Sequence, residues 1–188
     1  MHADICGPIK PISNSKKRYL ITFTYDFSTK TWVCFFIEKS EAFAVFKNFK
    51  NHVEKETNSF IKASRTDQGG EFTSEEFTNF CDVNDIQRQL TVVYMPLQNG
   101  VAKQKNRTIM NMVRSMISKK KIQKSFWPEA INWTVHVLNR SPTLAVKNKT
   151  PEEAWNGVKP SIKYFRVFGC ISHVHVPTVK ELSWMIRV

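Results

Sequence analysis

The stretch Arg65-Thr66-Asp67-Gln68-Gly69-Gly70-Glu71-Phe72 carries an aspartate between a short apolar segment and a pair of glycines. Residues 60–64, just before it, predict a brief strand. Thr73-x-x-Glu76, just after it, has the pattern of a capping box that opens a helix. Asp67 is therefore expected where a strand of an α/β fold gives way to a helix.

The residues before this stretch predict three strands and a helix. Residues 2–9 read as a strand, and two runs rich in β-branched and aromatic residues, 19–25 and 31–37, predict a hairpin. Apolar residues then recur at helical spacing from Ser40, expected as the N-cap, to about Thr57.

The residues after it predict one more strand and three helices. A strand is expected over residues 86–91, followed by a loop over 92–100. Helices are expected over 101–120, 126–139 and Pro151–Trp155. This order predicts a mixed five-stranded sheet with helices on both faces, which is the α/β layout of ribonuclease-H-like domains.

Two aspartates are the candidate metal ligands. In this layout the strand that carries Asp4 and the strand that ends before Asp67 are neighbours at the centre of the sheet, so the two carboxylates are expected to converge. Paired carboxylates bind Mg²⁺ well and repel each other without it. The alternative is that Asp4 is a surface acid near the N-terminus and that Asp67 is a turn residue before Gly69.

Several segments resemble the integrases of copia-type retrotransposons and follow one another in the order of that family. These segments are His2–Ile9, Arg65–Phe72, Asn99–Met116, Leu138–Thr143, Asn148–Trp155 and Arg166–Cys170. The resemblance implies a ribonuclease-H-like core that processes the 3′ ends of element DNA and joins them to target DNA, with Mg²⁺ or Mn²⁺ as cofactor.

The resemblance assigns catalysis and metal binding to Asp4 and Asp67, and to a glutamate that follows Asp67 after 35 intervening residues. Here that position holds Lys103. An ammonium group has no lone pair to offer a metal. We therefore expect Lys103 to pair with the two carboxylates in place of the ion, and this chain to bind metal poorly and to be catalytically impaired.

Two other hypotheses stay open at this point. The chain could be a domesticated or decaying core that keeps DNA or protein contacts without catalysis. It could also be a nuclease of the ribonuclease H type, with Glu71 or Asp26 as an additional acid near the centre. Glu71 is also the acid that could approach a metal held by Asp67.

The charge of the chain favours a nucleic-acid partner. The formal net charge is +12, and residues 86–128 contain nine Lys and Arg but no Asp or Glu. Such a basic stretch suits phosphate contacts and counterion release, although a solvated helix face is the alternative. The candidate DNA-binding residues are Asn99, Lys103, Lys105, Arg107 and Arg114.

We expect residues 1–142 to form the catalytic core, 143–177 its C-terminal extension, and 178–188 a divergent or truncated tail. No apolar run approaches the ~18 residues of a membrane span, and the polar start is unlike a signal peptide. A soluble protein that acts in the nucleus without membrane contact is expected, and the resemblance implies a homo-oligomer.

Overall fold

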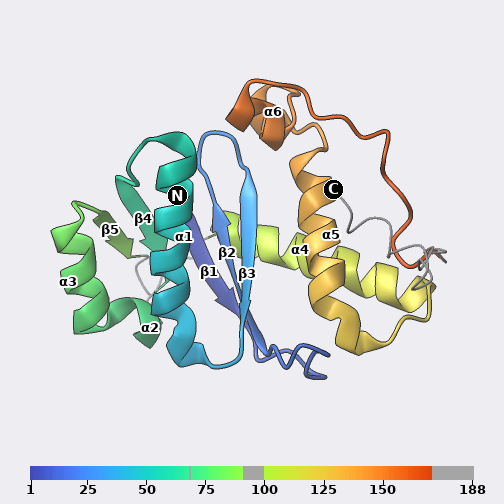
Figure 1. Cartoon of the computed structure of the whole chain (residues 1–188), viewed down its shortest axis with the longest axis horizontal. Helices are drawn as coiled ribbons and strands as arrows, with labels where there is room; N and C mark the ends of the chain where they lie inside the picture. The colour runs from blue at the N-terminus through green and yellow to red at the C-terminus, as the bar shows by residue number, and fades with distance from the viewer. Residues whose placement is uncertain (68, 91–99, 171–188) are drawn as a thin grey trace, which may run out of the picture.

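The computed structural model describes residues 1–67, 69–90 and 100–170 (Figure 1). Its strands are β1 (His2–Cys6), β2 (Tyr19–Thr24), β3 (Thr31–Phe36), β4 (Ala63–Thr66) and β5 (Gln87–Leu90). Its α-helices are α1 (Ala42–Thr57), α2 (Gly70–Thr73), α3 (Glu75–Val83), α4 (Gly100–Lys119), α5 (Trp127–Asn139) and α6 (Pro151–Asn156). Short 3₁₀ turns cover Lys39–Glu41, Lys124–Phe126 and Leu144–Val146.

The five strands form one mixed sheet in the order β3-β2-β1-β4-β5. The first three strands pair antiparallel, whereas β1–β4 and β4–β5 pair parallel. Each parallel connection passes through helical residues, as a crossover between parallel strands requires. The predicted mixed five-stranded α/β sheet is confirmed.

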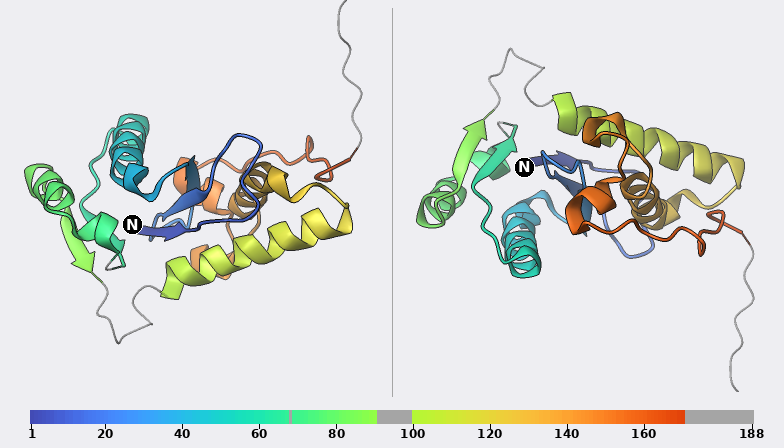
Figure 2. Two further views of the ribbon diagram at one scale, coloured as in Figure 1. Left: turned by 90° about the horizontal axis from the view of Figure 1, so that it is seen from below. Right: turned by 90° about the horizontal axis from the view of Figure 1, so that it is seen from above.

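Helices cover both faces of this sheet (Figure 2). Residues of α1 and α3 pack on one face in a core that includes Ile21 and Phe23 of β2. On the other face, α4 and α5 pack around Leu20. Successive strand residues point to opposite faces, so Leu20 and Ile21 serve different layers. Full burial of a phenylalanine such as Phe23 stabilises the fold by about 1.5–3 kcal/mol.

The helix α4 packs on the sheet through a stripe predicted from its sequence. Ile109, Val113 and Ile117 are buried, at a spacing of one helical turn. Asn106 continues the same stripe toward the N-terminus and is also buried, although its side chain is polar. A polar residue on a buried helix face needs a hydrogen-bond partner, and the partner it finds belongs to the candidate site.

Two strands begin or end three residues away from the expected position. β1 ends at Cys6, three residues early, because Gly7 takes a φ of +142° that does not continue a strand. β4 begins at Ala63 rather than at residue 60. Phe60 lies outside the strand and is 82% exposed.

Two residues that were predicted to be helix N-caps do not occupy the N-cap position. Ser40 lies inside the 3₁₀ turn Lys39–Glu41 and does not cap α1. Thr73 is the last residue of α2, so it cannot start the next helix. The cap of α3 is Ser74, whose hydroxyl accepts a hydrogen bond from the backbone N–H of Phe77 at 3.2 Å.

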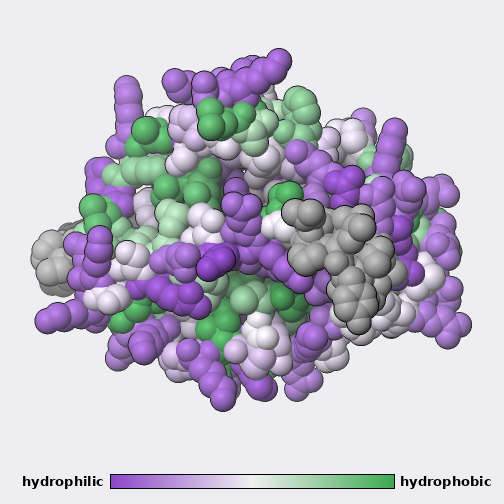
Figure 3. All heavy atoms as spheres, turned by 180° about the vertical axis from the view of Figure 1, so that it is seen from behind, coloured by the Kyte–Doolittle hydropathy of each residue, from purple (hydrophilic) through white to green (hydrophobic). Residues whose placement is uncertain are grey.

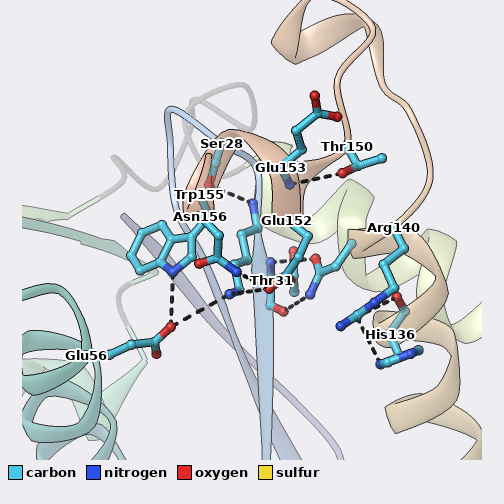
Figure 4. Close-up of polar contacts among 12 residues, drawn as sticks. Ser28, Thr31, Glu56, His136, Arg140, Thr150, Glu152, Glu153, Trp155 and Asn156 are labelled. Carbon is cyan, nitrogen blue, oxygen red and sulfur yellow. Dashed lines mark hydrogen bonds and ion pairs between the residues drawn. The ribbon is translucent and has the colours of Figure 1, made fainter. Parts of the chain in front are cut away.

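The segment after residue 142 is fastened to the core through α6. Thr150 caps α6, since its hydroxyl accepts from the Glu153 backbone N–H at 3.0 Å. Lys30 of the β2–β3 turn is buried and lies 3.1 Å from Oε1 of Glu152. The Trp155 indole donates to Glu56 of α1 at 3.2 Å (Figure 4).

The same lysine also lies over two aromatic rings. The Nζ atom of Lys30 is 5.2 Å from the ring centroid of Trp32 and 5.3 Å from that of Trp155. Cation–π attraction and the ion pair with Glu152 thus act on one buried ammonium. The proposed division of the chain at residue 142 stays a prediction, and residues 178–188 lie outside the described residues.

Among the helices in the described ranges, none is both long enough and apolar enough to span a membrane.

Candidate metal centre and nucleic-acid surface

The two candidate metal ligands extend from neighbouring parallel strands. His2 of β1 pairs with Arg65 of β4. Asp4 and Asp67 each follow two residues later, Asp4 within β1 and Asp67 directly after β4. If this register continued past the end of β4, the two aspartates would be expected on neighbouring strand ends, with strands spaced by about 4.8 Å. The expected neighbourhood of the two strands is confirmed, while metal binding stays a prediction.

Asp4 is held by a polar chain that sequence reasoning did not identify. Nδ2 of Asn106 donates to Oδ2 of Asp4 at 2.7 Å. The Thr22 hydroxyl donates to Oδ1 of Asn106 at 2.8 Å. Because that amide oxygen accepts from a hydroxyl, the amide NH₂ must face the carboxylate. Asp4, Thr22 and Asn106 are all buried, so each hydrogen bond acts away from bulk water.

Asp67 lies in a tight turn that brings a second carboxylate near it. The backbone N–H of Gly69 donates to Oδ1 of Asp67 at 3.1 Å. A Cβ atom at Gly69 would lie 3.0 Å from that oxygen and 2.9 Å from Oε1 of Glu71. The glycine thus leaves room for both carboxylates. Glu71 is already paired, because Nζ of Lys39 lies 3.1 Å from its Oε1.

Lys103 does not take the position that we expected from its place in the sequence. It is exposed on α4 and takes part in none of the ion pairs found among the described residues. Ala102 and Asn106 are buried and face the sheet. Since each residue of an α-helix is rotated by about 100° from the one before it, the side chain of Lys103 faces solvent. The predicted ion pair between Lys103 and the two carboxylates is therefore corrected.

The described residues offer an incomplete set of metal ligands. Within the described ranges, no three His, Cys, Asp or Glu residues come together as a possible metal site. Asp4 and Asp67 supply two carboxylates, and the third acid implied by the family resemblance is absent from α4, which contains no Asp or Glu. The donor set therefore fits a divalent ion only in part.

Three of the candidate DNA-binding residues share one side of α4. Lys103, Arg107 and Arg114 are exposed and are spaced by about one and two helical turns. This stripe reaches the end of β1. The pKa of the Cys6 thiol is raised by burial and by Asp4 and lowered by Arg114, so both charges act on that one side chain.

The other two candidates do not join this stripe. Lys105 lies on the opposite side of the helix, and its partial burial lowers the pKa of its ammonium. Asn99 lies outside the described residues. The side of the molecule over which α4 runs is shown in Figure 3, where hydrophilic side chains cover much of the surface.

Further cations, which the site prediction omitted, lie beside Arg114. Lys10, Lys121 and Lys124 line the same groove as Arg114, between the residues after β1 and the end of α4. The density of Lys and Arg after residue 86 was a signal for two of them. No local signal could have indicated Lys10, because it is brought to the groove only by the path of the chain after β1.

Comparison with known proteins agrees with this architecture. Residues 1–96 match the family model described as integrase core domain. In the solved structures, a chain of the cryoEM structure of the simian T-cell lymphotropic virus intasome in complex with PP2A regulatory subunit B56 gamma superimposes with a TM-score of 0.63. That match covers 94% of this chain and 59% of the other at 15% sequence identity, and it supports the ribonuclease-H-like fold.

The similar curated proteins are transposon polyproteins. The chain is 40% identical over 177 residues to the retrovirus-related Pol polyprotein from transposon TNT 1-94 of Nicotiana tabacum, covering 94% of this chain. It is 29% identical over 159 residues to that from transposon RE1 of Arabidopsis thaliana, covering 85% of this chain. It is 26% identical over 156 residues to the transposon Ty1-DR4 Gag-Pol polyprotein of Saccharomyces cerevisiae, covering 82% of this chain.

The aligned region spans only 13%, 11% and 10% of these three polyproteins. With the family model matched over residues 1–96 of 188, and with Pol polyproteins of copia-type retrotransposons as relatives, this chain belongs to the integrase core domain family.

Proposed function

We propose that this chain is the catalytic core of a copia-type retrotransposon integrase that binds DNA, and that its own 3′-processing and strand transfer are impaired by Lys103. The proposal is supported by the parallel pairing of β1, which carries Asp4, with β4, which ends one residue before Asp67, while position 103 on α4 holds a cation. Two carboxylates without a third make a weaker metal site than three carboxylates.

Asp4 and Asp67 are the residues that would hold Mg²⁺ or Mn²⁺. A bound divalent ion in such a site supplies Lewis-acid activation and stabilises charge on the oxygens of a phosphoryl transfer. The residues of this chain contribute orientation. The amide of Asn106 holds one oxygen of Asp4, and the backbone N–H of Gly69 holds one oxygen of Asp67. Both carboxylates are thereby positioned before an ion arrives.

The exposed stripe of Lys103, Arg107 and Arg114 is proposed to contact DNA phosphates. Contacts of this kind position a protein on DNA but carry little sequence information. We therefore propose weakly specific, salt-sensitive binding to element ends and target DNA. We further propose that the protein acts in the nucleus as a homo-oligomer, because two DNA ends must be joined to one target.

The test compares this protein with its Lys103→Glu variant in metal-dependent DNA nicking and strand transfer, with DNA binding measured in parallel. We expect the variant alone to cut. An Asp67→Asn change in the Lys103→Glu background is the control and should abolish the gain. Cutting by the unmodified protein at the rate of the variant would refute the assignment of position 103 as the third ligand.

A second function, DNA binding without catalysis, is favoured by one observation. The basic side of α4 carries Lys103, Arg107 and Arg114, while the carboxylates alone fall short of a metal site. If neither protein cuts and both bind DNA with a steep salt dependence, the domain acts as a DNA-binding module. If neither binds DNA, both functions are refuted.

A further inference from the structure

A groove of about 870 Å³ adjoins the candidate DNA stripe at Arg114, toward the end of α4. One wall is the chain after β1, from Cys6 to Lys10, and the other is α4 from Met110 onward. The groove is open along its length and is distinct from the pair Asp4 and Asp67, neither of which lines it.

The floor of this groove is apolar. Ile9, Val113 and Ile117 line it together with the buried ring of Trp127. Val113 and Ile117 belong to the core stripe of α4, so the floor is the outer edge of the hydrophobic core. Met110 adds a flexible, half-buried side chain of a kind that adapts to varied apolar partners.

The rim of the groove is cationic. Lys10, Arg114, Lys121 and Lys124 line it, and each of these four residues is exposed. No Asp or Glu is among the lining residues, all of which belong to the described part of the chain. Four positive charges around one apolar trough create a local positive potential that a partner must complement.

The segment before Cys170 packs against a residue of the groove. Gly169 has a φ of +75°, and a Cβ there would clash with Cδ1 of Ile122, which lines the groove. The partly buried ring of Phe168 packs on the core cluster that also contains Val113, Ile117 and Trp127. These contacts hold the side of the groove that Ile122 forms.

We propose that this groove binds an acidic amphipathic peptide segment of a partner protein, with aliphatic side chains on the floor and carboxylates at the rim. A DNA backbone would satisfy the four cations but would leave the apolar floor exposed, because a phosphodiester chain has no aliphatic group to insert. An amphipathic acidic segment satisfies both parts of the groove.

The chain's own residues 171–188 do not have the required chemistry. They contain one acid, Glu181, and two strong cations, Lys180 and Arg187. Their net charge has the same sign as the rim of the groove. The occupant is therefore a segment other than residues 171–188, and the proposal does not depend on whether Asp4 and Asp67 support catalysis.

The test uses fluorescence anisotropy with a labelled peptide in which two leucines, one helical turn apart, are flanked by glutamates. The full chain should bind it. Replacing both leucines by serine should weaken binding about tenfold or more, because the apolar contacts are lost. The Lys121→Glu, Lys124→Glu double variant should also weaken binding about tenfold, since each rim cation contributes a modest attraction.

The matched control is the Lys55→Glu, Lys119→Glu double variant, which makes the same charge change at exposed lysines that do not line the groove. It should bind the leucine peptide as the unmodified chain does, and the urea midpoints of all variants should agree. Equal binding of the leucine and serine peptides would overturn the proposal. Equal losses of peptide binding in the two double variants would also overturn it. So would a result in which Lys121 and Lys124 are needed to bind a short DNA duplex but not to bind the peptide.

Discussion

Nδ2 of Asn106 lies 2.7 Å from Oδ2 of Asp4, so a residue of α4 fixes the carboxylate of the first strand. This contact joins the helix that carries position 103 to the strand that carries the first aspartate. It keeps Lys103 within one helical turn of a residue that touches Asp4, while the side chain of Lys103 itself faces solvent. Changing residue 103 therefore alters charge near the site without removing a packed side chain.

Asn106→Leu should lower the free energy of unfolding by about 1–3 kcal/mol, because it leaves the buried carboxylate of Asp4 and the hydroxyl of Thr22 without this amide. Urea denaturation measures the loss. Asn111→Leu is the matched control, because Asn111 is exposed on the same helix and should cost little. Equal losses for the two variants would show that the polar chain contributes nothing specific.

The two adjacent glycines should respond to alanine with opposite signs. Gly69→Ala brings a methyl group to 3.0 Å from the Asp67 carboxylate and should destabilise by about 1 kcal/mol. Gly70→Ala meets no atom within 4 Å and lies in α2, so it should stabilise by about 0.5 kcal/mol. Melting temperatures of the two variants test this, and the same sign for both would contradict the turn geometry.

Arg107→Gln and Arg114→Gln should each reduce the slope of log binding constant against log salt by about one, as loss of a single phosphate contact predicts. The measurement is duplex DNA binding over a salt series. Lys55→Gln changes the net charge equally on exposed α1 and should leave the slope unchanged. Three identical slopes would mean that α4 is a solvated face with no part in DNA binding.

His136 should make stability depend on pH. Its Nδ1 lies 3.0 Å from the Arg140 guanidinium, a group that can only donate, and its Nε2 lies 3.0 Å from the Tyr164 hydroxyl. Burial and then Arg140 lower the pKa of His136 below 6.5, while Glu152 acts in the opposite direction. The contribution of the neutral ring is thus complete above pH 6.5 and is lost as the pH falls toward the lowered pKa.

The His136→Gln variant should lose that part of the pH dependence, because its amide cannot titrate. Urea midpoints on both sides of pH 6.5 measure the difference between the two proteins. Since His2 also has a lowered pKa, only the difference isolates residue 136. Parallel pH profiles for the two proteins would refute the prediction.

Much of the fold follows from local patterns in the sequence. The β2–β3 hairpin is visible as two β-branched and aromatic runs, and α4 as a stripe ending in Ile109, Val113 and Ile117. Element ends were harder to predict. Thr73 and Ser74 are equally good caps in isolation, and Ser74 caps α3 only because Thr73 completes α2. The choice depends on packing that the sequence pattern does not contain.

The family resemblance was enough to predict the positions of the candidate site residues in the sequence. It was not enough to predict how a side chain is oriented on its helix, or which residues distant in the sequence come into contact. Asp4 and Asp67 were singled out from their strands. The orientation of the Lys103 side chain could not be predicted, because it is determined by the burial of the adjacent residue Ala102. Asn106 offered a usable signal, since a polar residue within an apolar stripe has to find a partner.

The buried ammonium of Lys30 sets a lower limit on the length of a fully stable fragment. A chain cut before Glu152 would lose the closer of the two counterions of Lys30, keeping only Glu56 at 4.0 Å, and would uncover the ring of Trp32. Weaker pairing of a buried charge lowers the stability of a domain, whose total is only about 5–15 kcal/mol. Any shortened version, whether made by a protease or chosen for expression, should therefore retain α6 to keep its full stability.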